Sequence, residues 1–338
     1  MTPETHAGTR LRLDAYPCAL PHAAPAHGTP ERAFLTACNG ARSFDEVLAL
    51  DPAFAALAGE VDDVVWLDAP LAGEDAAATG PEVEVEPVLV LSAHPEDAWV
   101  SMGGWLLAHR ARVDATVVSC FTRVLQTHRP GEYRSVAEVS AVRADEAALC
   151  ARATGCRTAS LGLAQHELRL AEGAGRGAEG NDAVRRTLAL LLHGMIERQR
   201  PARVFAPAGI GARPDAVLLR DAVLELFEDA WFPGVAFHLY EDFPFSAAYL
   251  GVDDFLASFE NAYVDVQPWF HDATPQLDGK AALVSVFRSR LARPHETLVR
   301  KVAERNLFLH RGHPPEARGA ERFWTVGLAA DLYRFAAG

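Results

Sequence analysis

The chain has 338 residues, of which 49% are hydrophobic, so it can bury a sizeable core and is not expected to be intrinsically disordered. Its 32 basic and 45 acidic residues give a formal net charge of −13, and the sequence contains no basic run. This charge argues against nucleic acid and against anionic membrane surfaces as partners.

Cysteine usage and the N-terminal sequence indicate a compartment. The five cysteines are odd in number and lack the CxxC spacing of metal and redox sites, which favours a reducing environment. No apolar segment at the N-terminus resembles a signal peptide, and no apolar run approaches the ~20 residues that a membrane span needs. We therefore expect a soluble, cytoplasmic protein.

Residues 1–80 are expected to form a small, mainly helical module followed by a linker. A capping box at Ser43 to Glu46 opens one of three short helices, and a strand-like VVWL follows at 64–67. Residues 69–86 have linker composition, which places the boundary near residue 80. The helical part resembles the small winged-helix modules found beside biosynthetic enzymes, where a carrier or a peptide would be its partner. The alternative is an N-terminal extension packed on the main domain.

From residue 81 to 338 the sequence alternates between strand and helix patterns. Short apolar runs rich in β-branched residues predict strands at 88–92, 113–121, 158–163, 204–206 and 235–240, with amphipathic helices between them. Strands separated by helices predict a mostly parallel sheet with helices on both faces, as in Rossmann-like α/β folds. Polar side chains just after such strands lie where ligands bind.

The stretch from Val88 to Gly104 carries the strongest chemical signal. A buried strand ends in His94, and Glu96 and Asp97 follow before a helix with two glycines. An imidazole and one carboxylate can hold a metal while the second carboxylate serves as a base, which is the division of labour in zinc hydrolases. The tetrapeptide HPED at 94–97 alone is a weak signal, because such tetrapeptides also occur in ordinary turns.

The surrounding sequence resembles the PIG-L/LmbE-like de-N-acetylase family over about residues 85–326. AHPED at 93–97 is similar to the family's AHPDD, and further matches follow in the family's order. They are Arg143 with Glu146 on a long helix, residues 160–163, residues 204–216, residues 237–244, Lys280 with residues 287–289, and residues 321–324.

The resemblance implies roles for individual residues. His94 and Asp97 match the metal ligands of the first signature, and Glu96 matches the general base. Arg213 and Asp215 fall in the second signature and are expected to be catalytic, with Arg213 assisting an oxyanion and Asp215 at the position that orients its neighbours. The residues expected to bind substrate are Arg143, which matches the family, and His166, Tyr240 and Glu241, which lie at strand ends that face the pocket.

One position departs from the family pattern and leaves the cofactor open. Ala216 stands where the family has its third metal ligand, and a methyl group cannot coordinate Zn²⁺. Either another residue completes the site, with His166, His128 and His238 as candidates, or the site holds little metal. Zn²⁺ is therefore a doubtful cofactor, and no other is expected.

Three functions remain open from the sequence. The first is a hydrolase that removes an acyl group from an amino sugar or a small natural product in a biosynthetic pathway. The second is a divergent, metal-independent enzyme that uses the same pocket with Glu96 and Asp97 as acid and base. The third is a non-catalytic protein that binds a small ligand.

Overall fold

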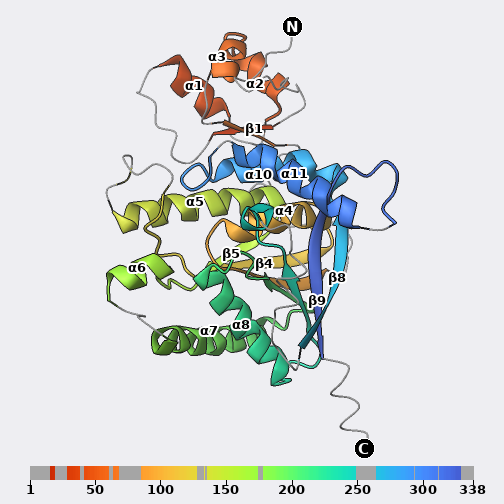
Figure 1. Cartoon of the computed structure of the whole chain (residues 1–338). Coiled ribbons are helices and arrows are strands. Elements are labelled where there is room, and N and C mark those ends of the chain that lie inside the picture. Colours follow the sequence, from red (N-terminus) through yellow and green to blue (C-terminus); the bar gives the residue numbers. More distant parts are fainter. Residues whose placement is uncertain are drawn as a thin grey trace, which may run out of the picture.

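The computed structural model describes residues 16–19, 29–38, 42–60, 64–67, 85–127, 133, 135–173, 178–248, 264–292, 294–310 and 312–328. Most of these residues lie in one α/β body, and the N-terminal ones form a separate group of helices and strands (Figure 1).

The central sheet is built around β3 (Glu86–Ser92). Strands β4 (Val113–Ser119) and β5 (Arg157–Ser160) lie on one side of β3, and β6 (Arg203–Pro207) and β7 (Ala236–Tyr240) lie on the other. These strands are all parallel, and the direction of strand addition reverses between β3 and β6. Ligands of open α/β sheets bind outside the carboxyl ends of the strands at such a reversal.

Two antiparallel strands extend the sheet beyond β7. β9 (Ala320–Leu328) pairs with β7, and β8 (Val264–Asp272) pairs with β9. In the part of the chain that the structure describes, the order is β5-β4-β3-β6-β7-β9-β8. The mostly parallel α/β fold is confirmed, although the sequence patterns did not predict β8 and β9.

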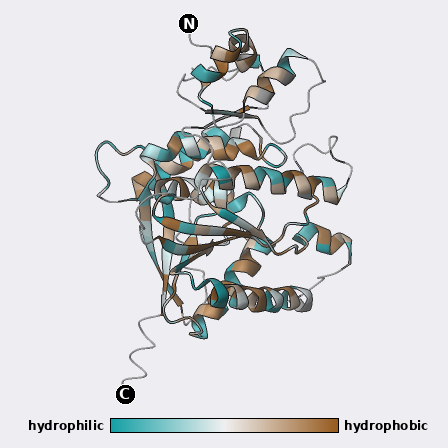
Figure 2. Ribbon diagram, turned by 180° about the vertical axis from the view of Figure 1, so that it is seen from behind, coloured by the Kyte–Doolittle hydropathy of each residue, from teal (hydrophilic) through white to brown (hydrophobic). Residues whose placement is uncertain are grey.

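Helices cover both faces of the sheet (Figure 1). One face carries α4 (Asp97–His109), α5 (Val136–Thr154), α10 (Leu277–Val286) and α11 (Pro294–Leu309), and the other carries α7 (Ala178–Gln199) and α8 (Pro214–Glu228). The side chains of β3 alternate between the two faces of the sheet. Val88 and Val90 pack into the core under α4, α5, α10 and α11, and Leu89 and Leu91 pack into the core under α7 and α8. Figure 2 shows the resulting hydrophobic strands between the two helical layers.

The remaining short elements of this body are α6 (His166–Ala171), η1 (Phe245–Ala248) and η2 (Thr274–Gln276). Among the described residues, no helix is both long enough and apolar enough to span a membrane.

The N-terminal group has its own core. Helices α1 (Pro30–Ala37), α2 (Phe44–Leu50) and α3 (Phe54–Glu60) accompany the antiparallel strands β1 (Tyr16–Ala19) and β2 (Val64–Leu67). The predicted capping box is confirmed, since the Ser43 backbone N–H donates to Glu46 Oε2 at 2.7 Å. β2 contacts α10 of the main body. The domain boundary near residue 80 and the winged-helix character stay predictions, because residues 68–84 lie outside the described ones.

Candidate active site

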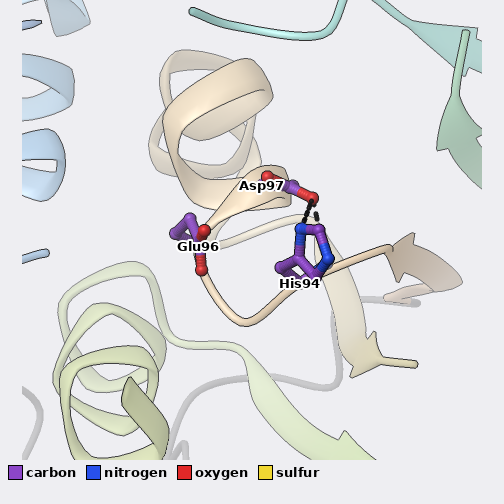
Figure 3. Close-up of side chains that lie close together, drawn as sticks. All are labelled: His94, Glu96 and Asp97. Atoms are coloured by element: carbon purple, nitrogen blue, oxygen red, sulfur yellow. Dashed lines mark hydrogen bonds and ion pairs between the residues drawn. The ribbon is translucent and has the colours of Figure 1, made fainter. Parts of the chain in front are cut away.

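The first cluster of polar side chains follows β3 directly. A tight turn between β3 and α4 carries His94 and Glu96, and Asp97 begins α4. The backbone N–H of His94 donates to Asp97 Oδ2 at 2.9 Å, and the Ser92 hydroxyl donates to the His94 carbonyl oxygen at 2.5 Å. His94, Glu96 and Asp97 are all buried. Figure 3 shows that His94 and Asp97 point at each other, whereas Glu96 lies to one side.

The second cluster follows β6, the strand next to β3. α8 begins at Pro214, which places Arg213 at the N-cap and Asp215 in the first helical turn. The connection from β6 turns through Gly209 and Gly211, whose φ angles of 77° and 86° suit glycine. Because β3 and β6 are parallel neighbours, the two loops meet at the carboxyl edge of the sheet.

Asp215 joins the two clusters. Its Oδ2 lies 2.9 Å from Nε2 of His94 and accepts the backbone N–H of His166 at 2.9 Å. Its Oδ1 accepts from Arg169 at 2.8 Å. Burial alone would raise the pKa of Asp215, but its contacts with His94 and Arg169 hold the pKa below its usual range. The carboxylate is therefore ionised and fixed by partners from several elements.

Arg213 contacts both His94 and Asp97. Its Nη1 donates to Asp97 Oδ1 at 3.0 Å, its Nη2 contacts Nδ1 of His94, and its guanidinium carbon lies 4.3 Å from the centre of the Phe245 ring. Burial opposes ionisation of Asp97, but the charges of Arg213 and His94 outweigh it and lower the pKa of Asp97 well below its usual range. Burial and the charge of Arg213 press the pKa of His94 downward, whereas the carboxylates of Asp97 and Asp215 outweigh them and raise it.

Glu96 lies between two arginines from other elements. Its Oε2 is 3.5 Å from Arg143 Nη1, and its Oε1 is 3.5 Å from Arg290 Nε. Oε2 of Glu96 is buried and accepts no hydrogen bond. Arg143 is itself buried and contacts the carbonyl oxygen of Gln126, and burial lowers its pKa from the usual arginine value. Oε2 of Glu96 therefore has an ion-pair contact with Arg143 but no hydrogen-bond donor.

Several residues expected at the site point elsewhere. The Tyr240 hydroxyl donates to the carbonyl oxygen of Leu91 at 2.9 Å, inside the core. Glu241 accepts from Arg305 and from Asn306, so it binds α11 and not the His94 cluster. His166 reaches the site through its backbone N–H.

His238 does not complete the cluster either. His238 stacks on Phe205 with ring centres 4.9 Å apart and lies in the middle of β7, before the carboxyl end of the strand. Burial lowers its pKa to about 4. His128 lies outside the described residues.

Sequence reasoning missed three charged residues of the site, namely Arg169, Arg290 and Asp242. Arg290 adjoins the family-like piece at 287–289, and Asp242 lies inside the piece at 237–244, so both had a local signal. Asp242 Oδ2 accepts the backbone N–H of Ile210 at 3.0 Å and thereby holds the loop after β6. Burial raises the pKa of Asp242 to about 7.

The residues at the site do not fit a catalytic zinc ion. His94, Glu96 and Asp97 offer ligand atoms within 4.8 Å of one another. However, Arg213 contacts His94 Nδ1 and donates to Asp97, and Glu96 is paired with arginines. Ala216, at the position of the family's third ligand, is fully buried and apolar. A catalytic zinc site needs three protein ligands and an open position, and the described residues supply neither in this arrangement.

The fold is shared with solved deacetylase structures. A structure of the A40926 pseudoaglycone deacetylase is 18% identical and covers 71% of this chain and 96% of its own, with a TM-score of 0.54. The zinc-inhibited form of a teicoplanin deacetylase is 18% identical over 72% of this chain and 99% of its own, with a TM-score of 0.55. The N,N'-diacetylchitobiose deacetylase from Pyrococcus horikoshii is 18% identical and covers 76% of this chain and 88% of its own, with a TM-score of 0.50.

No curated protein matches the sequence. A family match spans residues 89–227 and runs from β3 to α8, so it includes both loops of the site. The family is described as PIG-L: GlcNAc-PI de-N-acetylase. The chain therefore carries a PIG-L family domain at residues 89–227.

Proposed function

We propose that this protein is a hydrolase that removes an acyl group from the amino group of a sugar or a small natural product. The matched family is described as a de-N-acetylase, and the three solved structures compared above are deacetylases. The observation that carries the proposal is the buried Glu96 carboxylate, which keeps one oxygen without a hydrogen bond in the same turn as His94 and Asp97. A general base needs such a free oxygen to reach a proton.

The proposed reaction uses Glu96 as base and then as acid. Glu96 takes a proton from water, and the water oxygen forms a bond to the acyl carbon of the amide. The carbonyl oxygen gains a negative charge in the tetrahedral intermediate. When the C–N bond breaks, the nitrogen takes the proton from Glu96, and the products are a free amine and a carboxylic acid.

Arg213 supplies the positive charge for this reaction. A guanidinium has five N–H donors, and its contacts with His94 and Asp97 leave others available for a developing oxyanion. Burial lowers the pKa of Arg213, but Asp97 and Glu96 raise it above its ordinary value, so Arg213 remains charged and cannot exchange protons at neutral pH.

Arg143, Asp215 and Arg290 are positioning residues in this proposal. Arg143 and Arg290 approach Glu96 from separate elements, which fixes the direction of its carboxylate. Asp215 orients His94. Because another deacetylase of this fold was solved in complex with teicoplanin, glycosylated natural products form one substrate class to test here beside simple N-acetylated amino sugars.

The test is the release of free amine from a panel of N-acylated amino sugars and glycopeptides. Substitution Glu96→Gln keeps the shape of the side chain and removes the base, so we expect a loss of about 10²–10⁴-fold in kcat/KM. Glu172→Gln is the matched control, because Glu172 forms an exposed ion pair with Arg123 at 2.8 Å. Full activity of Glu96→Gln, or no amine release by wild type from any N-acyl compound, would contradict the proposal.

A second candidate is favoured by Ala216, which stands where the family has its third metal ligand, and by Arg213, which contacts the two expected ligands His94 and Asp97. A site without metal could perform acid–base chemistry on a different bond, with Glu96 and Asp97 moving the proton. The two candidates differ in their products, because only amide hydrolysis releases both an amine and a carboxylic acid.

A further inference from the structure

The two ring nitrogens of His94 face different groups. Nε2 lies 2.9 Å from Asp215, which is ionised and can only accept, so Nε2 carries a proton. Nδ1 lies 3.2 Å from Asp97 Oδ2. A ring nitrogen and a carboxylate that face one point, with a carboxylate behind the ring, form the arrangement in which proteins hold a metal.

Arg213 occupies that point. Its Nη1 donates to Oδ1 of Asp97 at 3.0 Å and its Nη2 contacts Nδ1 of His94, so one guanidinium meets both the ring nitrogen and the carboxylate that would hold a metal. Phe245 lies against the guanidinium at 4.3 Å. Only 14% of the Arg213 side chain is exposed, which makes it part of the buried site.

The residues around Arg213 also offer little to a metal ion. The side chain at 216 is a fully buried methyl group, so the first turn of α8 offers no ligand there. Glu96 is the remaining ligand in the cluster, and Arg143 and Arg290 pair with it. A divalent ion would have to displace Arg213 and would then lie among several arginines.

We propose that the Arg213 guanidinium has replaced the metal of this site, so that the protein carries its site cation as a side chain. The guanidinium neutralises Asp97 and holds His94, which are the structural tasks of a bound metal. This replacement explains why Arg213 and Ala216 occur together, because a third metal ligand has no use once the cation belongs to a side chain. This inference concerns the ground state of the site and does not depend on the proposed reaction.

The experiment measures zinc without substrate. Wild type, Ala216→His and the double substitution Arg213→His with Ala216→His are purified without chelator, dialysed against Zn²⁺ and analysed for bound metal. We expect wild type and Ala216→His to hold less than about 0.2 equivalents, and the double variant to hold about one equivalent. We also expect zinc to raise the Tm of the double variant alone. Stoichiometric zinc in wild type that is lost in Asp97→Asn would overturn the proposal, as would a folded double variant that binds none.

A second variant covers the case in which the double substitution does not fold. Arg213→Ala leaves a space of guanidinium size beside Asp97, so millimolar guanidinium chloride should raise its Tm, whereas sodium chloride at the same ionic strength should not. Wild type is the control, and guanidinium should not raise its Tm. Equal effects of the two salts on Arg213→Ala would contradict a specific site for the guanidinium.

Discussion

Nε2 of His94 lies 2.9 Å from Oδ2 of Asp215, and this contact joins the loop after β3 to the start of α8. The ionised carboxylate cannot donate, so Nε2 carries a proton toward it and the contact fixes the orientation of the ring. Nδ1 is thereby directed toward Asp97 and Arg213. The positions of the charged groups in the proposed mechanism depend on this contact.

Replacing Asp215 is expected to destabilise the protein strongly. The substitution Asp215→Ala leaves Arg169 and His94 without their buried partner, and breaking a buried ion pair typically costs about 3–5 kcal/mol. Chemical denaturation with the midpoint and slope both measured gives the free energy of unfolding. We also expect activity to fall, because His94 loses its orientation.

The matched control is Asp114→Ala. Asp114 pairs with Arg157 at 2.7 Å, but both side chains are about half exposed, and such pairs contribute roughly 0–1 kcal/mol. Equal losses of stability in the two variants would show that Asp215 is not a buried structural centre.

A second buried pair, Lys280 with Glu321, stabilises the kink in α4. Met102 has a non-helical conformation there. Glu321 accepts the backbone N–H groups of Gly104 and Trp105 at 2.9 and 2.7 Å, and Lys280 donates to the carbonyl oxygen of Ser101 at 2.7 Å. The two charges lie 2.6 Å apart.

Substitution Glu321→Ala should therefore cost about 3–5 kcal/mol, because it leaves Lys280 buried and unpaired. The substitution Gly104→Ala should also destabilise, since its Cβ would lie 2.9 Å from Glu321 Oε1. Thermal and chemical unfolding measure both effects. A loss below about 1 kcal/mol for Glu321→Ala would contradict a structural role for the pair.

Glu146 predicts a pH dependence of stability. Burial raises its pKa to about 7, although Ser289 donates to it through the backbone at 3.0 Å and the hydroxyl at 2.6 Å. In the unfolded chain its pKa is about 4.3. Between these values the folded state binds a proton that the unfolded state releases, so stability falls as pH rises from about 4 to about 7.

The substitution Glu146→Gln removes this dependence. As pH rises from about 5 to about 8, the variant should become more stable relative to wild type, so that its free energy of unfolding increases relative to the wild-type value by roughly 3 kcal/mol at most. Parallel denaturation series at the two pH values measure the change, and Glu172→Gln supplies the background for an exposed glutamate. If the difference in free energy of unfolding between Glu146→Gln and wild type stays constant across this pH range, Glu146 does not have the raised pKa.

The sequence was sufficient to predict the sheet and the meeting of the two loops. Apolar runs of strand length ended at His94 and shortly before Arg213, and parallel neighbouring strands bring such ends together. The edge strands β8 and β9 were missed, because antiparallel strands at the end of a sheet lack the alternation with helices on which the prediction rested.

The contacts inside the site were beyond sequence reasoning. Tyr240 and Glu241 lie at the end of β7 beside the predicted site, yet their side chains bind Leu91 and Arg305. Arg290 is far from Glu96 in sequence and meets it through packing of the segment after α10. Arg213 was recognised as a cation, but its place between His94 and Asp97 follows from tertiary geometry.

The most direct test of the proposed mechanism is amide hydrolysis in H₂¹⁸O with EDTA present. An N-acylated substrate found in the amine-release panel is incubated with wild type, and the released carboxylic acid is analysed by mass spectrometry. Metal-free hydrolysis through Glu96 and Arg213 predicts that the acid contains one oxygen from water and that EDTA leaves the rate unchanged. A rate that EDTA abolishes and Zn²⁺ restores, or an acid without ¹⁸O, would contradict this account.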